Sequence, residues 1–230
     1  MPIRERVAVG NIYHVCNRGV EKRNIFLEEK DYLRAIHNLF EFNDQKPAFN
    51  SGRIHLIGSG NQSIKPRQLL VEILAFCLMP NHFHLLLKPV IDGGLELFVR
   101  KFCGGYANYF NTKYQRSGTL FQGRYKLVPV TRDSHFVHLP FYIHLNPLDL
   151  IGSGWRNKKI NNYDKTIKFL ESYRWSSHLD YAGIKNFPSL TQRDFLLEFF
   201  GGSRGYKQSI EQWLRDLDLE SVKDISLDND

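Results

Sequence analysis

The run Met79-Pro80-Asn81-His82-Phe83-His84-Leu85-Leu86-Leu87 decides the fold, because two histidines flank one bulky apolar residue at the start of a strand-like segment. Successive side chains of a strand point to opposite faces of the sheet. We therefore expect His82 and His84 on one face and Phe83 in the core on the other. Two imidazoles held side by side on a rigid strand make half of a metal site.

The elements expected around this run are strands and helices in a mixed order. Residues with high β-propensity predict strands over 11–18, 69–78, 82–88 and 124–130, and apolar residues three to four apart predict helices over 28–42, 94–114 and 131–145. Pro140 lies inside the last helix and is expected to kink it. The order predicts an α+β sandwich, a largely antiparallel sheet with helices packed on it, followed by a C-terminal extension with short helices near 194–200 and 206–214.

The charge of the chain is unevenly distributed. The formal net charge is +7 over 230 residues, but the segment 216–230 holds six acidic residues and one lysine and so carries −5. Residues 1–215 therefore carry +12. Such a basic body favours a polyanionic partner, of which nucleic acid is the commonest. The alternative is that the charge serves solubility alone.

The three cysteines are far apart and form no Cys-x-x-Cys pair, so we expect reduced thiols, with neither a disulfide framework nor a zinc site. No apolar run approaches the roughly 20 residues that span a bilayer. The N-terminal sequence lacks the apolar stretch of a signal peptide. These features predict a cytoplasmic protein without membrane association.

A metal site needs a third ligand, and Asn146 is the candidate. A neutral amide oxygen leaves the ion its full charge and leaves positions open for a phosphate oxygen. Two imidazoles and an amide oxygen suit Mg²⁺ or Mn²⁺ in a partly hydrated site. An isolated His-x-His pair is more often structural than metal-binding, so both interpretations stay open on these residues alone.

Tyr142 is the candidate nucleophile, because it precedes Asn146 by four residues and both side chains can face the metal from one side of a helix. Asn146 precedes Pro147 and is biased away from helical geometry, so that contact depends on how the helix ends. Attack by the phenolate would leave a phosphotyrosine and free a hydroxyl. The alternative is a half-buried aromatic that packs on the sheet. Three rivals have a spacing better explained by core packing: Tyr106, Tyr109 and Tyr114.

The run 115–126 mixes cations, amides, glycines and aromatic rings. That mixture suits single-stranded nucleic acid, since cations bind phosphates, rings stack on bases and amides contact base edges. A solvated basic loop explains it equally well. The residues expected to bind nucleic acid, in this run and nearby, are Arg18, Arg100, Lys101, Arg116, Gln122, Arg124 and Lys126.

Together these motifs resemble the single-tyrosine HUH transposases, in particular the REP-associated tyrosine transposases and the small IS200-like transposases of insertion sequences. The resemblance covers roughly residues 8–180. It is carried by the runs 13–19, 79–84, 120–126, 142–147 and 173–177.

The resemblance implies the HUH fold, with both histidines on an antiparallel sheet. It implies that Tyr142 attacks single-stranded DNA to give a 5′-phosphotyrosine and a free 3′-hydroxyl, and that Asn146 is the polar third metal ligand. Members of this family commonly recognise a DNA hairpin beside the cleavage site. Pro140 and the long segment 43–68 depart from the family pattern.

We therefore expect a tyrosine transposase catalytic domain over 1–150 and a C-terminal extension with an acidic tail over 151–230. The expected function is a metal-dependent single-stranded DNA endonuclease and strand transferase, acting on single-stranded or hairpin DNA as a monomer or homodimer. The alternative is a non-catalytic binder of hairpin DNA or RNA that keeps the fold. A third hypothesis, a small-molecule metallohydrolase, is disfavoured by the basic body.

Overall fold

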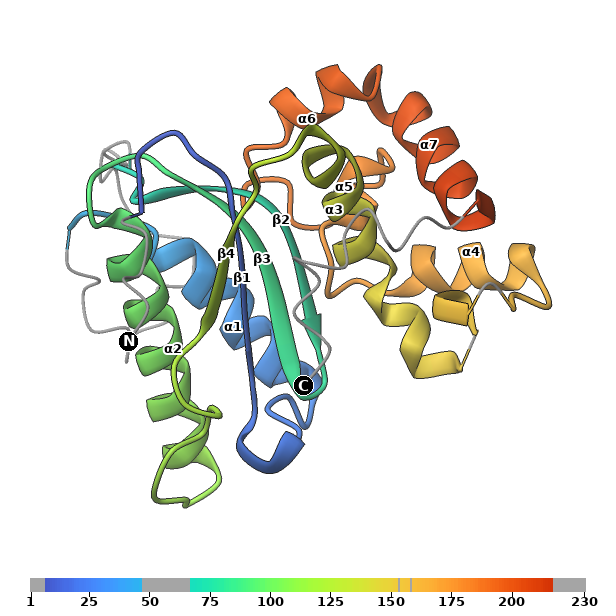
Figure 1. Cartoon of the computed structure of the whole chain (residues 1–230). Helices are drawn as coiled ribbons and strands as arrows, with labels where there is room; N and C mark the ends of the chain where they lie inside the picture. The colour runs from blue at the N-terminus through green and yellow to red at the C-terminus, as the bar shows by residue number, and fades with distance from the viewer. Residues whose placement is uncertain (1–6, 47–66, 153, 158, 217–230) are drawn as a thin grey trace, which may run out of the picture.

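An antiparallel sheet forms the centre of the molecule (Figure 1). In the computed structural model, which describes residues 7–46, 67–152, 154–157 and 159–216, four strands pair in the order β2-β3-β1-β4. Every pairing between neighbours is antiparallel. The strands are β1 (Tyr13–Arg18), β2 (Val71–Met79), β3 (His82–Pro89) and β4 (Lys126–Pro129).

Strands β2 and β3 form a tight hairpin around Pro80 and Asn81, in which Met79 lies opposite His82. The loop after β1 closes over this turn, since the Gly19 amide donates to the Asn81 carbonyl over 2.8 Å. The turn therefore sets the position of His82, the first residue of β3, beside the end of β1.

Helices α1 (Glu29–Glu41) and α2 (Gly94–Lys113) cover one face of the sheet, and in Figure 1 α2 lies to the left of the strands and α1 behind them. Phe83 points into this layer, with its ring 5.1 Å from that of Phe102 and 5.9 Å from that of Phe121. In the core of this face, every second residue of the strands packs on the apolar stripe of α2. Strand side chains alternate between the two faces, and apolar residues three to four apart share one side of a helix.

Helix α3 (Asp133–Leu145) and the chain that follows it cover part of the opposite face, on the right of Figure 1. A register shift between Ile73 and Ala75 turns both Leu74 and Ala75 toward this second core. The later elements are η2 (Asn146–Ile151), η3 (Trp155–Asn157), α4 (Tyr163–Ser172), α5 (His178–Tyr181), α6 (Asp194–Phe199) and α7 (Gly202–Asp216), and η1 (Val20–Lys22) follows β1.

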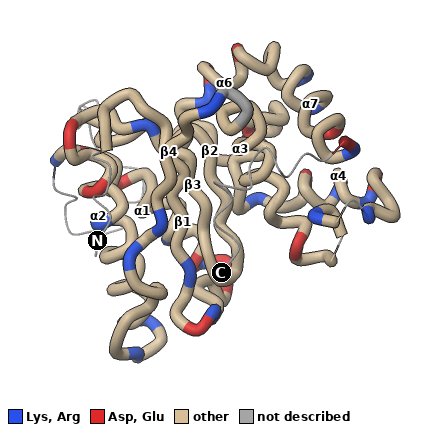
Figure 2. Tube along the Cα trace, in the orientation of Figure 1, with Lys and Arg blue, Asp and Glu red and all other residues tan. Residues whose placement is uncertain are grey.

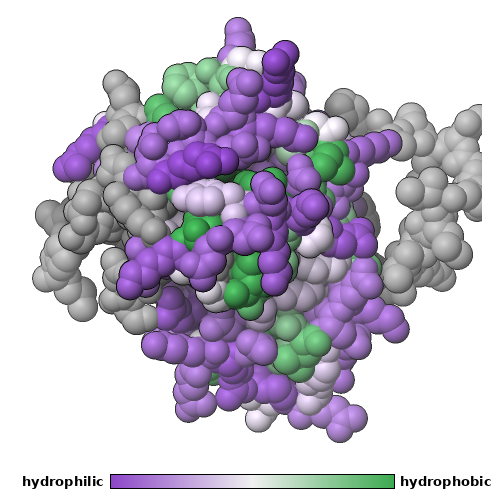
Figure 3. Space-filling view, turned by 90° about the vertical axis from the view of Figure 1, so that its right-hand side faces the viewer, coloured by the Kyte–Doolittle hydropathy of each residue, from purple (hydrophilic) through white to green (hydrophobic). Residues whose placement is uncertain are grey.

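The residues after α3 pack on the sheet through the same core as α3. Tyr206, Ile210 and Trp213, at helical spacing on α7, are all buried in it. Over these C-terminal helices the surface is largely hydrophilic, with hydrophobic patches between (Figure 3). The segment Trp175–Ser177 pairs directly with β2, where the Leu78 amide donates to the Trp175 carbonyl and the Ser177 amide to the Phe76 carbonyl.

A buried cluster of polar groups ties α5 and α7 to α3. His144 Nε2 lies 2.7 Å from Ser177 Oγ, and its Nδ1 lies 2.8 Å from the Tyr206 hydroxyl. The same hydroxyl lies 2.9 Å from His178 Nδ1. Burial lowers the pKa of His178 to about 4, with a further contribution from Lys207, and burial also holds the pKa of His144 well below its usual value.

A second polar cluster ties α1 to α2 on the other face. The fully buried carboxylate of Asp31 accepts hydrogen bonds from Lys113, from the hydroxyls of Tyr109 and Tyr114, and from the Leu27 amide. Burial alone would raise the pKa of Asp31, but these donors outweigh it and hold that pKa below its usual value.

The predicted α+β class and the antiparallel sheet are confirmed. Helix α3 continues through Pro140 to Leu145. The N-cap of α3 is Arg132, whose side chain makes no capping hydrogen bond. Strand β4 is shorter than the predicted 124–130, and most of the segment 43–68 and nearly all of the acidic tail lie outside the described residues.

Three elements between Asn146 and Ser172 were not predicted. Helix α4 does carry a start signal, since the Asn162 side chain accepts from the Lys165 amide. No helix in the described part of the chain is long and apolar enough to cross a membrane.

Candidate active site

The two histidines of β3 lie on the face that α3 covers, with their ring centroids 4.9 Å apart. His82 Nδ1 lies 2.6 Å from Oδ1 of Asn81, which can only accept, so Nδ1 carries a proton, and in the neutral imidazole the lone pair is on Nε2. The Nε2 atoms of His82 and His84 are both buried. This tautomer leaves a nitrogen of His82 able to bind a metal.

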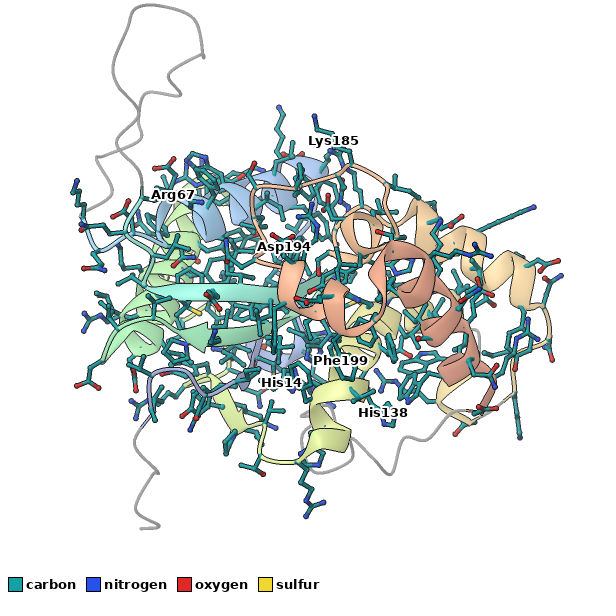
Figure 4. All side chains as sticks on the ribbon, turned by 90° about the horizontal axis from the view of Figure 1, so that it is seen from above. His14, Arg67, His138, Lys185, Asp194 and Phe199 are labelled. Atoms are coloured by element: carbon teal, nitrogen blue, oxygen red, sulfur yellow. The ribbon has the colours of Figure 1, made fainter. Side chains whose placement is uncertain are left out.

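His14 completes this group from the neighbouring strand, and sequence reasoning missed it. Its Nε2 lies 2.9 Å from Nδ1 of His84, and both side chains are fully buried. Figure 4 shows His14 where the sheet meets the C-terminal layer. A hydrogen bond to the second nitrogen of a ligating imidazole fixes its ring orientation and its tautomer. His14 is therefore placed to orient His84.

The ring of Tyr142 stands edge-on to both buried histidines, with centroids 6.1 Å from His84 and 6.5 Å from His14. Helix α3 brings it there, and only 1% of Tyr142 is exposed. The structure thus brings together residues that are 58 positions apart in the sequence.

Asn146 directly follows α3 and is fully buried. Its Nδ2 donates to the Tyr142 carbonyl one turn earlier, over 2.8 Å, so the amide oxygen is directed away from that carbonyl. The predicted helical relation of the two residues is retained although Pro147 comes next, because Asn146 itself has helical backbone angles.

Arg156 joins these two side chains. Its Nη1 donates to the Tyr142 hydroxyl over 3.2 Å, and its Nη2 donates to Asn146 Oδ1 over 3.1 Å. The guanidinium in turn pairs with both carboxylate oxygens of Asp149, and Trp155 Nε1 donates to the same carboxylate. Sequence reasoning missed Arg156, which comes from the unpredicted elements after α3.

By their chemistry, two imidazole nitrogens and one amide oxygen are donors that a divalent ion can take. Among the described residues, no group of three or more His, Cys, Asp or Glu side chains is arranged to hold a metal. His82, His84 and Asn146 could therefore hold one only as a mixed set of imidazole and amide donors, which suits a partly hydrated Mg²⁺ or Mn²⁺.

Two of the predicted DNA-binding residues lie on the histidine face. Arg18 is directly opposite His82 in the β1–β3 register, and Lys126 is opposite Cys16, which is itself opposite His84. Directly opposite residues share one face of a sheet. Figure 2 shows basic positions along the strands and near the end of β1. The strand register thus places two of the predicted cations, Arg18 and Lys126, on the histidine face.

Arg100 and Arg124 lie instead on the α2 side of the sheet. They line a pocket of about 430 Å³ together with Glu96, Phe121 and Tyr125. The pocket holds cations and rings, as the predicted binding surface requires, but it opens on the other side of the sheet from the histidines.

The remaining predicted DNA-binding residues have local roles. Lys101 Nζ donates to the carbonyls of Asp44 and Lys46, and Arg116 Nη1 donates to Asn111 Oδ1. The exposed Gln122 donates its backbone amide to the Arg18 carbonyl, which ties the 115–126 run to the end of β1. The predicted residues thus do not form one continuous surface among the described residues.

A comparison with protein families matches the segment that holds four of these residues. A family model described as "Transposase IS200 like" matches residues 62–146. The resemblance to the IS200-like transposases is confirmed. The matched segment includes His82, His84, Tyr142 and Asn146, and it ends before Arg156 and begins after His14.

Other comparisons found more distant similarity. The structure of the REP-associated tyrosine transposase bound to a REP hairpin is similar over 81% of this chain and 89% of its own, at 15% identity and a TM-score of 0.48. A crystal structure of a candidate transposase from Deinococcus radiodurans R1 is similar over 61% of this chain and 95% of its own, at 15% identity and a TM-score of 0.36. No curated protein matches the chain.

Proposed function

We propose that this IS200-like transposase cleaves and transfers single-stranded DNA, with Tyr142 as its nucleophile. One observation carries the proposal: the ring of the buried Tyr142 lies 6.1 Å from the ring of His84, the second histidine of the His-x-His pair, measured between centroids. Nucleophile and metal-binding imidazoles must meet at one phosphodiester for such a reaction.

In the proposed reaction, the Tyr142 oxygen attacks the phosphorus of a phosphodiester. The new bond joins the tyrosine oxygen to the phosphorus, which stays on the 5′ end of the downstream fragment, and the bond between phosphorus and the 3′ oxygen of the upstream fragment is broken. The phenol proton passes to water, and the departing 3′ oxygen takes a proton from water. The products are a 5′-phosphotyrosine and a free 3′-hydroxyl. In a second step, the 3′-hydroxyl of another strand can attack the phosphotyrosine and release Tyr142.

The chain's own residues prepare this step. His14 orients His84, Asn81 sets the tautomer of His82, and Asn146 fixes its own amide against the backbone of Tyr142. When bound by His82, His84 and Asn146, Mg²⁺ or Mn²⁺ supplies charge stabilisation at the phosphate oxygens.

The DNA strand is proposed to approach over the histidine face. Arg18 and Lys126 lie there at the level of His82 and His84, where they can neutralise phosphates on either side of the scissile bond. The resemblance described above implies a hairpin beside the cleavage site, so hairpin-bearing strands are the substrates to test first. Binding should weaken steeply with salt, as phosphate contacts require.

Covalent capture tests the proposal. Labelled single-stranded DNA from both flanks of the gene is incubated with the protein and Mn²⁺ or Mg²⁺, with chelator as the parallel reaction, and is resolved on denaturing gels. We expect a metal-dependent protein–DNA adduct with the wild type and with Tyr163→Phe, a control at a half-buried tyrosine of α4. Tyr142→Phe should bind DNA and form no adduct.

The other outcomes are equally informative. An adduct that survives Tyr142→Phe assigns the nucleophile to another residue. Salt-dependent binding without any adduct, across all flanking strands and both metals, replaces the proposed reaction by non-catalytic binding of hairpin DNA or RNA.

A further inference from the structure

We propose that Arg156 is a second catalytic residue of this site, which holds the Tyr142 hydroxyl and binds the scissile phosphate. The inference rests on the proposed function, because it concerns the phosphate that Tyr142 would attack. It starts from the two hydrogen bonds by which one guanidinium joins the Tyr142 hydroxyl to the Asn146 amide oxygen, at 3.2 and 3.1 Å.

The position of Arg156 relative to solvent supports the assignment. Tyr142 is 1% exposed and Asn146 is fully buried, whereas the Arg156 side chain is 30% exposed. The side chain that contacts the buried hydroxyl is thus itself partly open to solvent. A phosphate that approaches Tyr142 from this side meets the guanidinium first.

The site holds the guanidinium in a fixed orientation. Asp149 accepts from Nε and Nη2, with the shortest distance 2.8 Å, and the Arg156 guanidinium lies 4.5 Å from the ring centroid of the buried Trp155. Trp155 Nε1 also donates to Asp149 over 2.7 Å, which holds the carboxylate in place. Because Asp149 and Trp155 hold the guanidinium, it keeps its orientation toward Tyr142 and Asn146 at little entropic cost.

Two glycines before Arg156 allow the chain to turn back toward the end of α3. Gly152 and Gly154 both have left-handed backbone angles, with φ of 56° and 68°. At Gly154 an added Cβ would lie 2.8 Å from the Lys159 carbonyl oxygen. Glycine at these positions lets the chain turn back from η2, so that η3 faces the end of α3.

The guanidinium geometry suits both tasks. Its planar fork places two donors on two different acceptors, here a phenol and an amide oxygen, and the same fork binds a phosphate through two parallel hydrogen bonds. As the phosphorus–tyrosine bond forms, the phenol oxygen no longer needs its donor, and the freed N–H is directed at the phosphate now attached to it. An ammonium group is a single point charge and would reach only one of these atoms at a time.

Thermodynamic coupling between Arg156 and the charge of the phosphate tests this role. Two strands of one sequence are compared, one with the normal phosphodiester at the mapped cleavage position and one with an uncharged methylphosphonate there. Binding is measured by fluorescence anisotropy with Tyr142→Phe and with Tyr142→Phe/Arg156→Gln, in chelator so that no metal contributes.

We expect the methylphosphonate to weaken binding to Tyr142→Phe by about tenfold, the size of one charge-assisted hydrogen bond. It should leave binding to the double variant unchanged. Tyr142→Phe/Arg193→Gln is the matched control: Arg193 is another half-buried arginine, which donates to the Pro188 carbonyl, and it should keep the full tenfold difference. An equal loss in all three variants would overturn the inference.

A kinetic measurement gives a second result. With otherwise wild-type protein and metal, Arg156→Gln should slow adduct formation about 100-fold, as loss of one preorganised donor does elsewhere. Arg156→Lys should recover part of that loss. If Arg156→Gln does not fold, Arg156→Lys decides alone, and a wild-type rate with it would reject the inference.

The two proposals fail in different ways. A wild type that forms no Tyr142 adduct overturns the proposed function and this inference together. A wild type that forms the adduct, with no coupling between Arg156 and the phosphate charge, overturns the role of Arg156 and leaves Tyr142 as the nucleophile.

Discussion

Nε2 of His14 lies 2.9 Å from Nδ1 of His84, and the two rings stack with their centroids 5.1 Å apart. The pairing of β1 with β3 brings these residues together although 70 positions separate them in the chain. One strand thus carries the two candidate histidine ligands, and its neighbour carries the group that orients one of them.

Replacing His14 should weaken metal binding without removing a ligand. For His14→Leu we expect Mn²⁺ affinity to fall about 10- to 100-fold, because the His84 ring loses the partner that fixes its orientation. His14→Gln keeps a nitrogen near the same place and should lose less. Electron paramagnetic resonance of free Mn²⁺ during titration measures this directly. The control His37→Gln, at an exposed histidine of α1, should bind as the wild type does. Unchanged affinity in His14→Leu would contradict the role given to His14.

The buried carboxylate of Asp31 should contribute strongly to stability. Asp31→Asn leaves Lys113 without its buried counter-ion and should lower the free energy of unfolding at pH 7 by about 2 kcal/mol. Glu28→Gln is the control, because Glu28 binds the same lysine at the surface and should change stability by less than about 1 kcal/mol. Urea unfolding followed by circular dichroism measures both, and equal effects would refute the distinction.

The same carboxylate predicts a dependence on acid pH. The pKa of Asp31 in the folded protein is below its unfolded value of 3.8, so its contribution is fully present above that value. It is lost as the pH falls through the folded pKa. The unfolding free energy of Asp31→Asn should therefore fall less steeply than that of the wild type below about pH 4.

The buried histidines should act in a separate pH window. The pKa of His178 falls from 6.5 to about 4 on folding, so both His144 and His178 are neutral in the folded protein at pH 7. Between pH 6.5 and 4 the unfolded chain binds these protons and the folded chain does not, so stability falls as the pH is lowered. Urea midpoints at pH 7.5, 5.5 and 4.5 should decrease in that order. His178→Asn should decrease less, and an identical slope would argue against this origin.

Two adjacent glycines of α2 should respond in opposite ways to alanine. An added Cβ at Gly104 meets no atom within 4 Å, so Gly104→Ala should stabilise the protein by up to about 1 kcal/mol through helix propensity. At Gly105 the added Cβ would lie 2.4 Å from Cε2 of Phe42, so the ring must move and Gly105→Ala should be destabilising. Thermal unfolding compares them, and an equal gain from both would show that Phe42 yields without cost.

The local features of the site could be predicted from the sequence. The alternation of a strand fixes which face His82, Phe83 and His84 take, and the turn of a helix fixes the relation of Tyr142 to Asn146. Both relations depend only on neighbours in the sequence, and the structure has both.

The missing parts depend on contacts between distant segments. His14 could be assigned only from the register of β1 against β3, which the sequence of neither strand specifies alone. Arg156 depends on a return of the chain through η2 and η3, short 3₁₀ elements without a periodic pattern. The pair Gly152 and Gly154 marks a turn there, and it was the one local signal of that return.

The pairing of Trp175–Ser177 with β2 has a consequence for assembly. An outer strand with unused backbone donors and acceptors is a template on which another chain can add a strand, and proteins guard against this. Here the Leu78 amide already donates to the Trp175 carbonyl, and the Phe76 carbonyl already accepts from the Ser177 amide. At the opposite margin, β4 is only four residues long and ends in Pro129, which has no amide to donate. Both margins of the sheet, as far as the structure describes them, thus carry features that disfavour the addition of a strand from a second copy.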